Sequence, residues 1–286
     1  MCSIGGHANL SLVLVKEKWV QMPKFAANLS WLFTDLDFKD RFAAAADAGF
    51  KGVECLFPYD HAAAEVAELL HESGLEQILI NAPPGDWDGG ERGLGCLPGR
   101  HDDFRISIEK ALRYAKSIGC TRIHAMAGVA PGDVDPAKLR DQFVENLAFA
   151  ADICGQAGVR VLIEPINTTD MPGYFLCHPD QAAMIISEVA SAHLALQFDI
   201  YHIAMMGLDV AAYIKRYAPM TAHFQIAGMP GRNEPIGGDV DYPVLFDLVD
   251  GLGYDGWIGC EYRPRESTLE GLGWMQSPAI RSPASP

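Results

Sequence analysis

The chain has 286 residues, of which 49% are hydrophobic and 21% are charged. This composition supplies a substantial apolar core and argues against disorder over most of the length. Acidic residues outnumber basic ones by 37 to 22, so the net charge is −15, and no long Lys/Arg run offsets it. A phosphate backbone needs positive charge on its partner, so nucleic acid is not an expected ligand.

Seven dispersed cysteines without a Cys-x-x-Cys pair indicate free thiols in a reducing compartment, and we expect a cytoplasmic protein. No stretch approaches the roughly 20 apolar residues of a membrane span, so no membrane association is expected. Residues 1–21 lack the basic start and clear cleavage site of a signal peptide. We expect 1–21 to be a disordered upstream extension, 22–276 to form one domain, and 277–286 to be a flexible tail.

Strand-like and helix-like segments alternate along the chain. The expected strands cover Phe25–Ser30, Gly52–Leu56, Gln77–Ala82, Arg122–Met126, Val161–Glu164, Leu194–Asp199, His223–Gln225 and Trp257–Glu261. The expected helices cover Phe38–Ala48, His61–Ser73, Phe104–Ile118, Pro136–Ala157, Pro179–Val189, Val210–Tyr217 and Tyr242–Leu252. Four glycines are expected to end helices, because glycine adopts the left-handed conformation easily. These are Gly49, Gly74, Gly119 and Gly158.

Eight strands with intervening helices and no linker predict a single (β/α)₈ TIM barrel of the α/β class. A doubly wound open sheet is the alternative, but it favours a glycine-rich turn after the first strand, and the segment NLSWLFTDLD has none. Residues 83–103 form an unusually long connection with six glycines and three prolines. This connection is either a flexible surface loop or a lid over the barrel mouth.

Four successive strands end on a potential metal ligand: Glu164, Asp199, Gln225 and Glu261, which lie 35, 26 and 36 residues apart. In a closed barrel these strand ends converge on one face, where active sites are built. His223 shares a face of its strand with Gln225, and we favour Gln225 because it lies nearer the strand end. Such oxygen-rich ligands suit a hard divalent cation such as Mg²⁺ or Mn²⁺.

Two glutamates beside a divalent cation suit the transfer of a proton between neighbouring carbon atoms. The cation holds a carbonyl oxygen and the adjacent hydroxyl, and it stabilises the enediolate formed when a proton leaves carbon. Glu164 or Glu261 removes that proton, and the other glutamate returns one to the adjacent carbon. The sequence leaves open which glutamate does which. This chemistry is isomerisation or epimerisation without an organic cofactor.

The residues around these positions resemble the hydroxypyruvate isomerase family, a branch of the xylose-isomerase-like barrels. The resemblance runs from about Phe25 to Gln276 and includes the stretches FAANLSWLF, NAPPGDW, GERGLGCLPGR, RYAKSIGCTRIHAMAG, IEPINT, MPGYFL, FDIYH, HFQIAGMPGRNEP and GYDGWIGCEYRPR. It implies a metal-dependent aldose–ketose-type isomerase that interconverts hydroxypyruvate and 2-hydroxy-3-oxopropanoate (tartronate semialdehyde). It also implies the same four metal ligands and the same acid/base pair.

A 2-oxo hydroxy acid substrate is an anion, so a strongly acidic protein needs local positive charge to bind it. Arg232, in the segment GMPGRNEP, is the candidate donor to the substrate carboxylate, and its alternative is a surface-loop arginine. His202, in the segment FDIYH, is the candidate partner of a substrate oxygen, and its alternative is a structural histidine.

Other functions are open to the same fold. A 2-oxo-tetronate isomerase or a ketose 3-epimerase would use identical chemistry in a different pocket. An endonuclease of the abasic-site type would need a His-rich zinc cluster and a basic DNA-binding face, and the sequence offers neither. A sugar-acid sensor would have no use for two proton-transfer groups. A homo-oligomer is compatible with the sequence, which does not fix the assembly.

Overall fold

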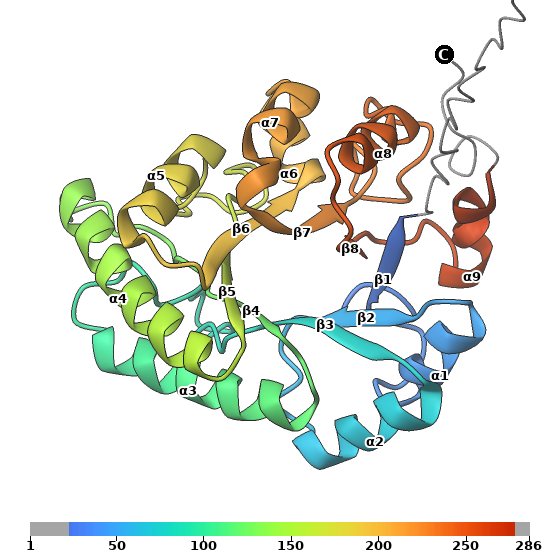
Figure 1. Ribbon diagram of the computed structural model, residues 1–286, viewed down its shortest axis with the longest axis horizontal. Helices are drawn as coiled ribbons and strands as arrows, with labels where there is room; N and C mark the ends of the chain where they lie inside the picture. Colours follow the sequence, from blue (N-terminus) through green and yellow to red (C-terminus); the bar gives the residue numbers. More distant parts are fainter. Residues whose placement is uncertain (1–22, 278–286) are drawn as a thin grey trace, which may run out of the picture.

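The structure, a computed structural model, describes residues 23–277. The expectations for the upstream extension, 1–21, and for residues 278–286 of the tail lie outside the described residues. Eight parallel strands close into a barrel in sequence order, from β1 to β8, with helices around the outside (Figure 1). Because β1 pairs with β8, the sheet has no open edge. The predicted TIM barrel is confirmed, and the open doubly wound sheet is excluded.

The observed strands start and end within two residues of the expected ones. They are β1 (Lys24–Asn28), β2 (Gly52–Cys55), β3 (Glu76–Asn81), β4 (Arg122–His124), β5 (Arg160–Ile163), β6 (Leu194–Asp199), β7 (Thr221–Ile226) and β8 (Trp257–Cys260). The helices are α1 (Asp40–Asp47), α2 (Ala63–Ser73), α3 (His101–Ser117), α4 (Pro136–Gln156), α5 (Pro179–Val189), α6 (Ile200–Met205), α7 (Val210–Tyr217), α8 (Tyr242–Gly251) and α9 (Thr268–Gly271). The short helices α6 and α9 were not expected.

Local sequence signals explain most of these boundaries. The four glycines expected to end helices all have positive φ, from 62° to 96°. At the other end, Asp135 begins α4 by accepting a hydrogen bond from the backbone N–H of Ala137, and Pro136 occupies the first turn. Asp209 and Asp241 begin α7 and α8 in the same way.

The barrel interior is apolar toward one end and polar toward the other. The main core lies between the strands and the surrounding helices, and a separate small apolar cluster consists of Leu79, Leu162, Ala195 and Ala222. Two residues further along their strands, Leu162 is followed by Glu164 and Ala195 by Gln197. Because side chains alternate along a strand, these polar groups face the same interior. The apolar cluster therefore closes the barrel below a buried polar layer at the carboxyl ends of the strands.

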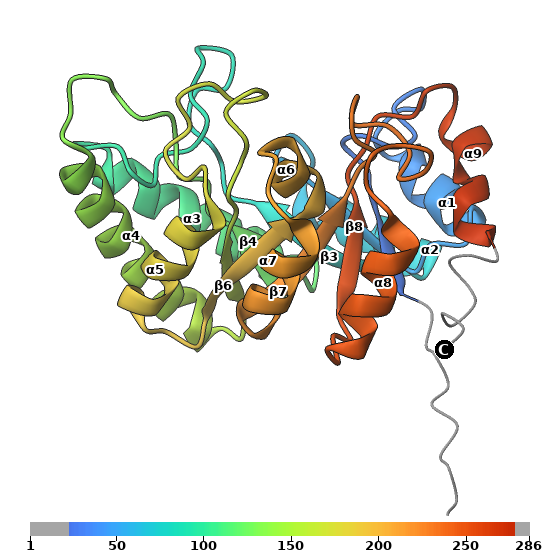
Figure 2. The ribbon, with the colours of Figure 1, turned by 90° about the horizontal axis from the view of Figure 1, so that it is seen from above.

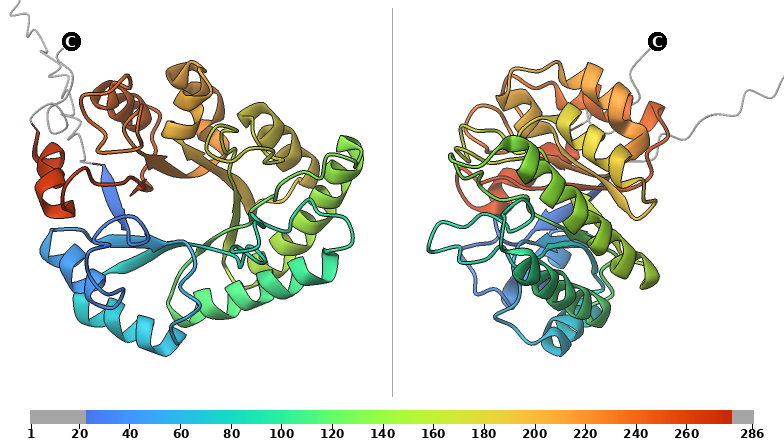
Figure 3. Two further views of the ribbon diagram at one scale, coloured as in Figure 1. Left: turned by 180° about the vertical axis from the view of Figure 1, so that it is seen from behind. Right: turned by 90° about the vertical axis from the view of Figure 1, so that its left-hand side faces the viewer.

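The loops that follow β3 and β5 rise with α6 at one end of the barrel (Figure 2), and the side view shows the same end (Figure 3). The loop after β3 is partly fixed to the barrel, because the backbone N–H groups of Gly95 and Cys96 donate to the carbonyls of Met126 and Ala127. Its tip carries Trp87, which is 38% exposed. The base of this loop is packed, and whether the tip acts as a lid stays a prediction.

The structure also bears on the expectations of free thiols and of no membrane-spanning helix. The six cysteines within the described range are free thiols, and five of them are buried. Burial raises the pKa of the Cys96 thiol to about 12, so it is not a reactive nucleophile at neutral pH. Among the helices that the structure describes, none combines the length and the apolarity needed to cross a membrane.

Candidate active site

The four expected ligands meet at the carboxyl-terminal mouth of the barrel. Glu164 and Glu261 directly follow β5 and β8, while Asp199 and Gln225 lie in the last two residues of β6 and β7. Each is at most 7% exposed. Closing the sheet brings these positions together, because parallel strands of a barrel all end at the same rim.

One half of the site is held by side-chain amides. The Nε2 group of Gln197 donates to Oε2 of Glu164 at 3.0 Å and to Oε1 of Gln225 at 2.6 Å. The Nε2 group of Gln225 donates in turn to Oε2 of Glu261 at 2.7 Å. The amide of Gln197 therefore connects the side chains that end β5 and β7.

The other half is held by Arg232 and His202. One guanidinium nitrogen of Arg232 lies 2.7 Å from Oε1 of Glu261 and 3.5 Å from Oδ2 of Asp199. The Nε2 atom of His202 lies 3.6 Å from Asp199 and 3.7 Å from Oε1 of Glu164. These contacts close a ring, so the structure brings all six expected site residues together.

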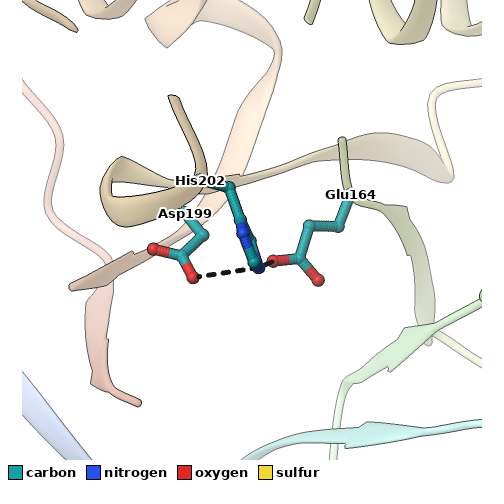
Figure 4. Close-up of side chains that lie close together, drawn as sticks. All are labelled: Glu164, Asp199 and His202. Carbon is teal, nitrogen blue, oxygen red and sulfur yellow. Dashed lines mark ion pairs between the residues drawn. The ribbon is translucent and has the colours of Figure 1, made fainter. Parts of the chain in front are cut away.

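The junction between β6 and α6 explains why one carboxylate oxygen of Asp199 has no hydrogen-bond partner. Asp199 ends β6 and also begins α6, where its Oδ1 atom accepts a hydrogen bond from the backbone N–H of Tyr201 at 2.9 Å. The first turn of α6 then places His202 between the carboxylates of Asp199 and Glu164 (Figure 4). Ligand atoms of Glu164, Asp199 and His202 all lie within 4.8 Å of one another.

This arrangement fits a divalent cation. Oε1 of Glu164 and Oδ2 of Asp199 are buried without a hydrogen-bond partner, and buried polar atoms are normally satisfied. Burial raises the pKa of Asp199 to about 6 and that of Glu261 to about 8, while Arg232 opposes both shifts. Burial and the nearby Glu261 and Asp199 raise the pKa of Glu164 well above its usual range. A cation would relieve the repulsion between these carboxylates.

Arg232 is held by aromatic rings as well as by carboxylates. Its guanidinium carbon lies 4.5 Å from the ring centre of Trp31 and 5.0 Å from that of Tyr201. Its backbone has φ of 54°, an uncommon value for a residue other than glycine, at the end of a Met229–Pro230–Gly231 turn. The Nε atom of Arg232 and the indole Nε1 atom of Trp31 are both buried without a partner. Arg232 is therefore a positioned group and not a free surface-loop arginine.

His202 is neutral in this environment. Burial, together with the nearby Arg232 and His124, lowers its pKa well below the usual value. Its Nδ1 atom lies 2.6 Å from the side-chain amide nitrogen of Asn167, whose own oxygen accepts the backbone N–H groups of Thr169 and Asp170. Asn167 therefore fixes the imidazole ring, and the other ring nitrogen faces the carboxylates.

Sequence reasoning missed the polar residues behind the ligands. Gln197, Asn28 and Glu54 are at most 1% exposed, and each contacts at least one expected site residue. The available signal was a polar side chain inside an otherwise apolar strand. The Nε2 atom of His223, a residue that was set aside as a ligand, lies 2.6 Å from Oε2 of Glu54. His124 does face the site, 3.6 Å from Oε2 of Glu164.

Comparisons with known proteins agree with the barrel fold. A family model described as xylose isomerase-like TIM barrel matches residues 42–277. The chain is 56% identical over 255 residues to a 2-oxo-tetronate isomerase of Cupriavidus necator, covering 89% of this chain and 98% of that protein. It is 41% identical over 254 residues to the hydroxypyruvate isomerase of Escherichia coli, with the same two coverages.

Among solved structures, a protein of Brucella melitensis described as AP endonuclease, family 2, superposes with a TM-score of 0.88. It is 44% identical to this chain, and the match covers 89% of this chain and 98% of that one. An L-ribulose 3-epimerase matches with a TM-score of 0.72 at 18% identity, over 91% and 90% of the two chains, and so shares the fold. The chain belongs to the xylose isomerase-like TIM-barrel family, and it is an isomerase of that family.

Proposed function

We propose that this isomerase interconverts hydroxypyruvate and 2-hydroxy-3-oxopropanoate by proton transfer between two neighbouring carbon atoms. The observation that carries the proposal is a pair of buried glutamates, Glu164 and Glu261, which follow β5 and β8 and belong to one closed ring of contacts. Burial raises the pKa of both carboxyl groups, which favours their protonated form, and the nearby Arg232 opposes this shift at each of them. A proton donor and a proton acceptor can therefore coexist in one site.

Each residue of the ring has a part in this proposal. Glu164, Asp199, Gln225 and Glu261 would hold a divalent cation, Mg²⁺ or Mn²⁺. When bound, such a cation polarises adjacent carbonyl and hydroxyl oxygens of a substrate and stabilises negative charge that develops on them. The buried, unpartnered carboxylate oxygens support this assignment.

The protein groups then move the protons. One glutamate removes a proton from the hydroxymethyl carbon, and the other gives a proton to the former carbonyl carbon, so the ketone becomes an aldehyde. The hydroxyl proton of the substrate passes to the former carbonyl oxygen, which leaves the overall composition unchanged. Neutral His202 holds one of these oxygens. Arg232 binds the substrate carboxylate, since a guanidinium can donate two hydrogen bonds to it.

A second substrate has its own support. The relative at 56% identity is named a 2-oxo-tetronate isomerase, whereas the relative at 41% identity is named a hydroxypyruvate isomerase. The two substrates differ by one carbon atom, and the same residues would transfer the proton in both. A ketose 3-epimerase would also use this chemistry, but its neutral substrate gives Arg232 no carboxylate to bind.

A direct comparison of rates decides between these substrates. Purified protein with Mg²⁺ is given hydroxypyruvate, 2-oxo-tetronate or a free ketose, and kcat/KM is measured for each. We expect hydroxypyruvate to have the highest value, by at least about 10-fold. A higher value for 2-oxo-tetronate would transfer the assignment to the four-carbon acid. Turnover of the ketose alone would contradict both assignments and the role of Arg232.

A further inference from the structure

Glu54 on β2 is a buried acid that the proposed proton transfer does not use. It is 1% exposed, and both of its oxygens accept hydrogen bonds. Oε1 accepts from the amides of Asn28 at 3.0 Å and Gln225 at 2.7 Å, and Oε2 lies 2.6 Å from Nε2 of His223. Neither oxygen is left to bind a ligand, so the carboxylate of Glu54 acts on its neighbours.

Strand β8, which is separated from β2 by β1, leaves room for this carboxylate. A Cβ atom at Gly259, on β8, would lie 2.4 Å from Oε1 of Glu54 and 2.5 Å from Oε2. Real Cβ atoms do not approach oxygens so closely, so a side chain at this position would displace the carboxylate. The absence of a side chain at Gly259 on β8 therefore makes space for the carboxylate of Glu54 on β2.

The hydrogen bonds of Gln225 have a defined direction. Its Nε2 group faces two carboxylate oxygens, one from Glu54 and one from Glu261, each at 2.7 Å. Ionised carboxylates only accept hydrogen bonds. The opposite orientation of the amide would place its oxygen against both of them. The carbonyl oxygen of Gln225 is therefore turned toward Gln197, whose amide also binds Glu164.

We propose that Glu54 is a positioning residue for the metal site, which holds the amide of Gln225 with its carbonyl oxygen on the side of Glu164. An amide has a single oxygen that can bind a hard cation, so its orientation decides whether Gln225 is a ligand. His223 and Asn28 fix the carboxylate of Glu54 in turn. The inference rests on the proposed function, because it takes the site to bind a divalent cation.

The test is Mn²⁺ affinity, measured on metal-stripped protein by electron paramagnetic resonance or calorimetry. Glu54→Gln keeps the shape of the side chain and removes the fixed acceptor. We expect Mn²⁺ binding to weaken about 10- to 100-fold, as is typical when a partner of a metal ligand is lost. Gln77→Met is the matched control, because Gln77 is buried on the adjacent strand and its side-chain amide donates to Leu79 and Cys55 instead of to a residue of the site. It should bind Mn²⁺ like the wild type.

Exchanging the amide and the carboxylate between positions 54 and 225 separates a positioning role of Glu54 from a role in general stability. Gln225→Glu alone sets two carboxylates against each other, and we expect it to weaken Mn²⁺ binding. In the double variant with Glu54→Gln, the amide at position 54 can donate a hydrogen bond to the carboxylate at position 225, which is the reverse of the wild-type direction. A carboxylate at position 225 presents an oxygen whichever way it turns. We therefore expect the double variant to recover Mn²⁺ affinity to within about threefold of wild type, a non-additive result.

Two results would overturn the proposal: Glu54→Gln binding Mn²⁺ like the wild type, or a folded double variant that shows the summed loss of the two single variants. If Glu54→Gln alone does not fold, as judged by circular dichroism, the double variant decides. Wild-type protein that binds Mn²⁺ but converts neither 2-oxo acid would refute the proposed substrates and leave this inference standing. Wild-type protein that binds no Mn²⁺ would overturn this inference directly.

Discussion

The two halves of the barrel place different chemistry at the same mouth. Strands β5 to β8 end in Glu164, Asp199, Gln225 and Glu261, three carboxylates and one amide. In the last two residues of strands β1 to β4, the buried polar side chains are Asn28, Glu54, Asn81 and His124. The carboxylates of the second half include oxygens without a partner, whereas both oxygens of Glu54 accept hydrogen bonds. Unpartnered buried carboxylate oxygens therefore occur at Glu164 and Asp199, whereas the carboxylate of Glu54 is fully hydrogen-bonded.

The largest expected effect comes from the carboxylates of the second half. Glu164→Gln and Glu261→Gln each remove a proton-transfer group, and each should lower kcat/KM by on the order of 10³-fold or more. Glu188→Gln, on the outer surface of α5, is the control and should leave the rate unchanged. The variant that lacks the proton-donating glutamate keeps the base, so it should still exchange the proton on the hydroxymethyl carbon of the substrate with D₂O. Near-normal turnover by both glutamine variants would contradict the assignment of proton transfer to the carboxylates of the second half.

Metal removal should expose the repulsion among these carboxylates. In the metal-free folded protein the carboxyl pKa values are raised by burial, so folding takes up protons relative to the unfolded chain. Stability is then fully present below the ordinary carboxyl pKa and is lost as pH rises toward about 8. The Tm measured with a chelator should fall from about pH 6 to about pH 8.5, and Mn²⁺ should reduce this fall. A metal-free Tm that rises over this range would contradict the assignment.

Arg232 should affect substrate binding more than the chemical step. Arg232→Gln removes the charge that faces the substrate carboxylate, and we expect KM to rise by about 10- to 100-fold, the loss of one charge-assisted contact. Arg140→Gln, which breaks an ion pair with Glu188 on the outer surface, is the control. Steady-state kinetics with a 2-oxo acid separate kcat from KM. A fall in kcat alone would mean that Arg232 acts only through Glu261.

The smallest expected effect is on stability, around the carboxylate of Glu54. Gly259→Ala would place a methyl group against the carboxylate of Glu54. We expect the free energy of unfolding to fall by about 1–3 kcal/mol, as for other overpacked interiors. Urea unfolding measures it, and Gly251→Ala, where no atom lies within 4 Å of the added carbon, is the control. Equal stability of the two variants would show that Glu54 is free to move.

The fold, and the placement of the candidate ligands at strand ends, could be predicted from the sequence because both depend on local signals. Strand ends, glycines after helices and acids that end apolar runs can be read over a few residues, as at Gly74 or Asp199. Helix α6 was missed because six residues carry too little periodicity. The contacts of Glu54 were missed because its partners Gln225 and His223 lie 171 and 169 residues further along the chain. Only closure of the barrel brings such groups together.

The central claim is that the two buried glutamates transfer a proton between neighbouring carbons of a 2-oxo hydroxy acid when a divalent cation is bound. The most direct measurement is proton NMR of metal-stripped protein with hydroxypyruvate in D₂O, before and after addition of Mg²⁺. The account predicts that the aldehyde product forms only with Mg²⁺, carries deuterium at the former carbonyl carbon, and does not form with Glu261→Gln. Aldehyde formation that is independent of both Mg²⁺ and Glu261 would contradict it.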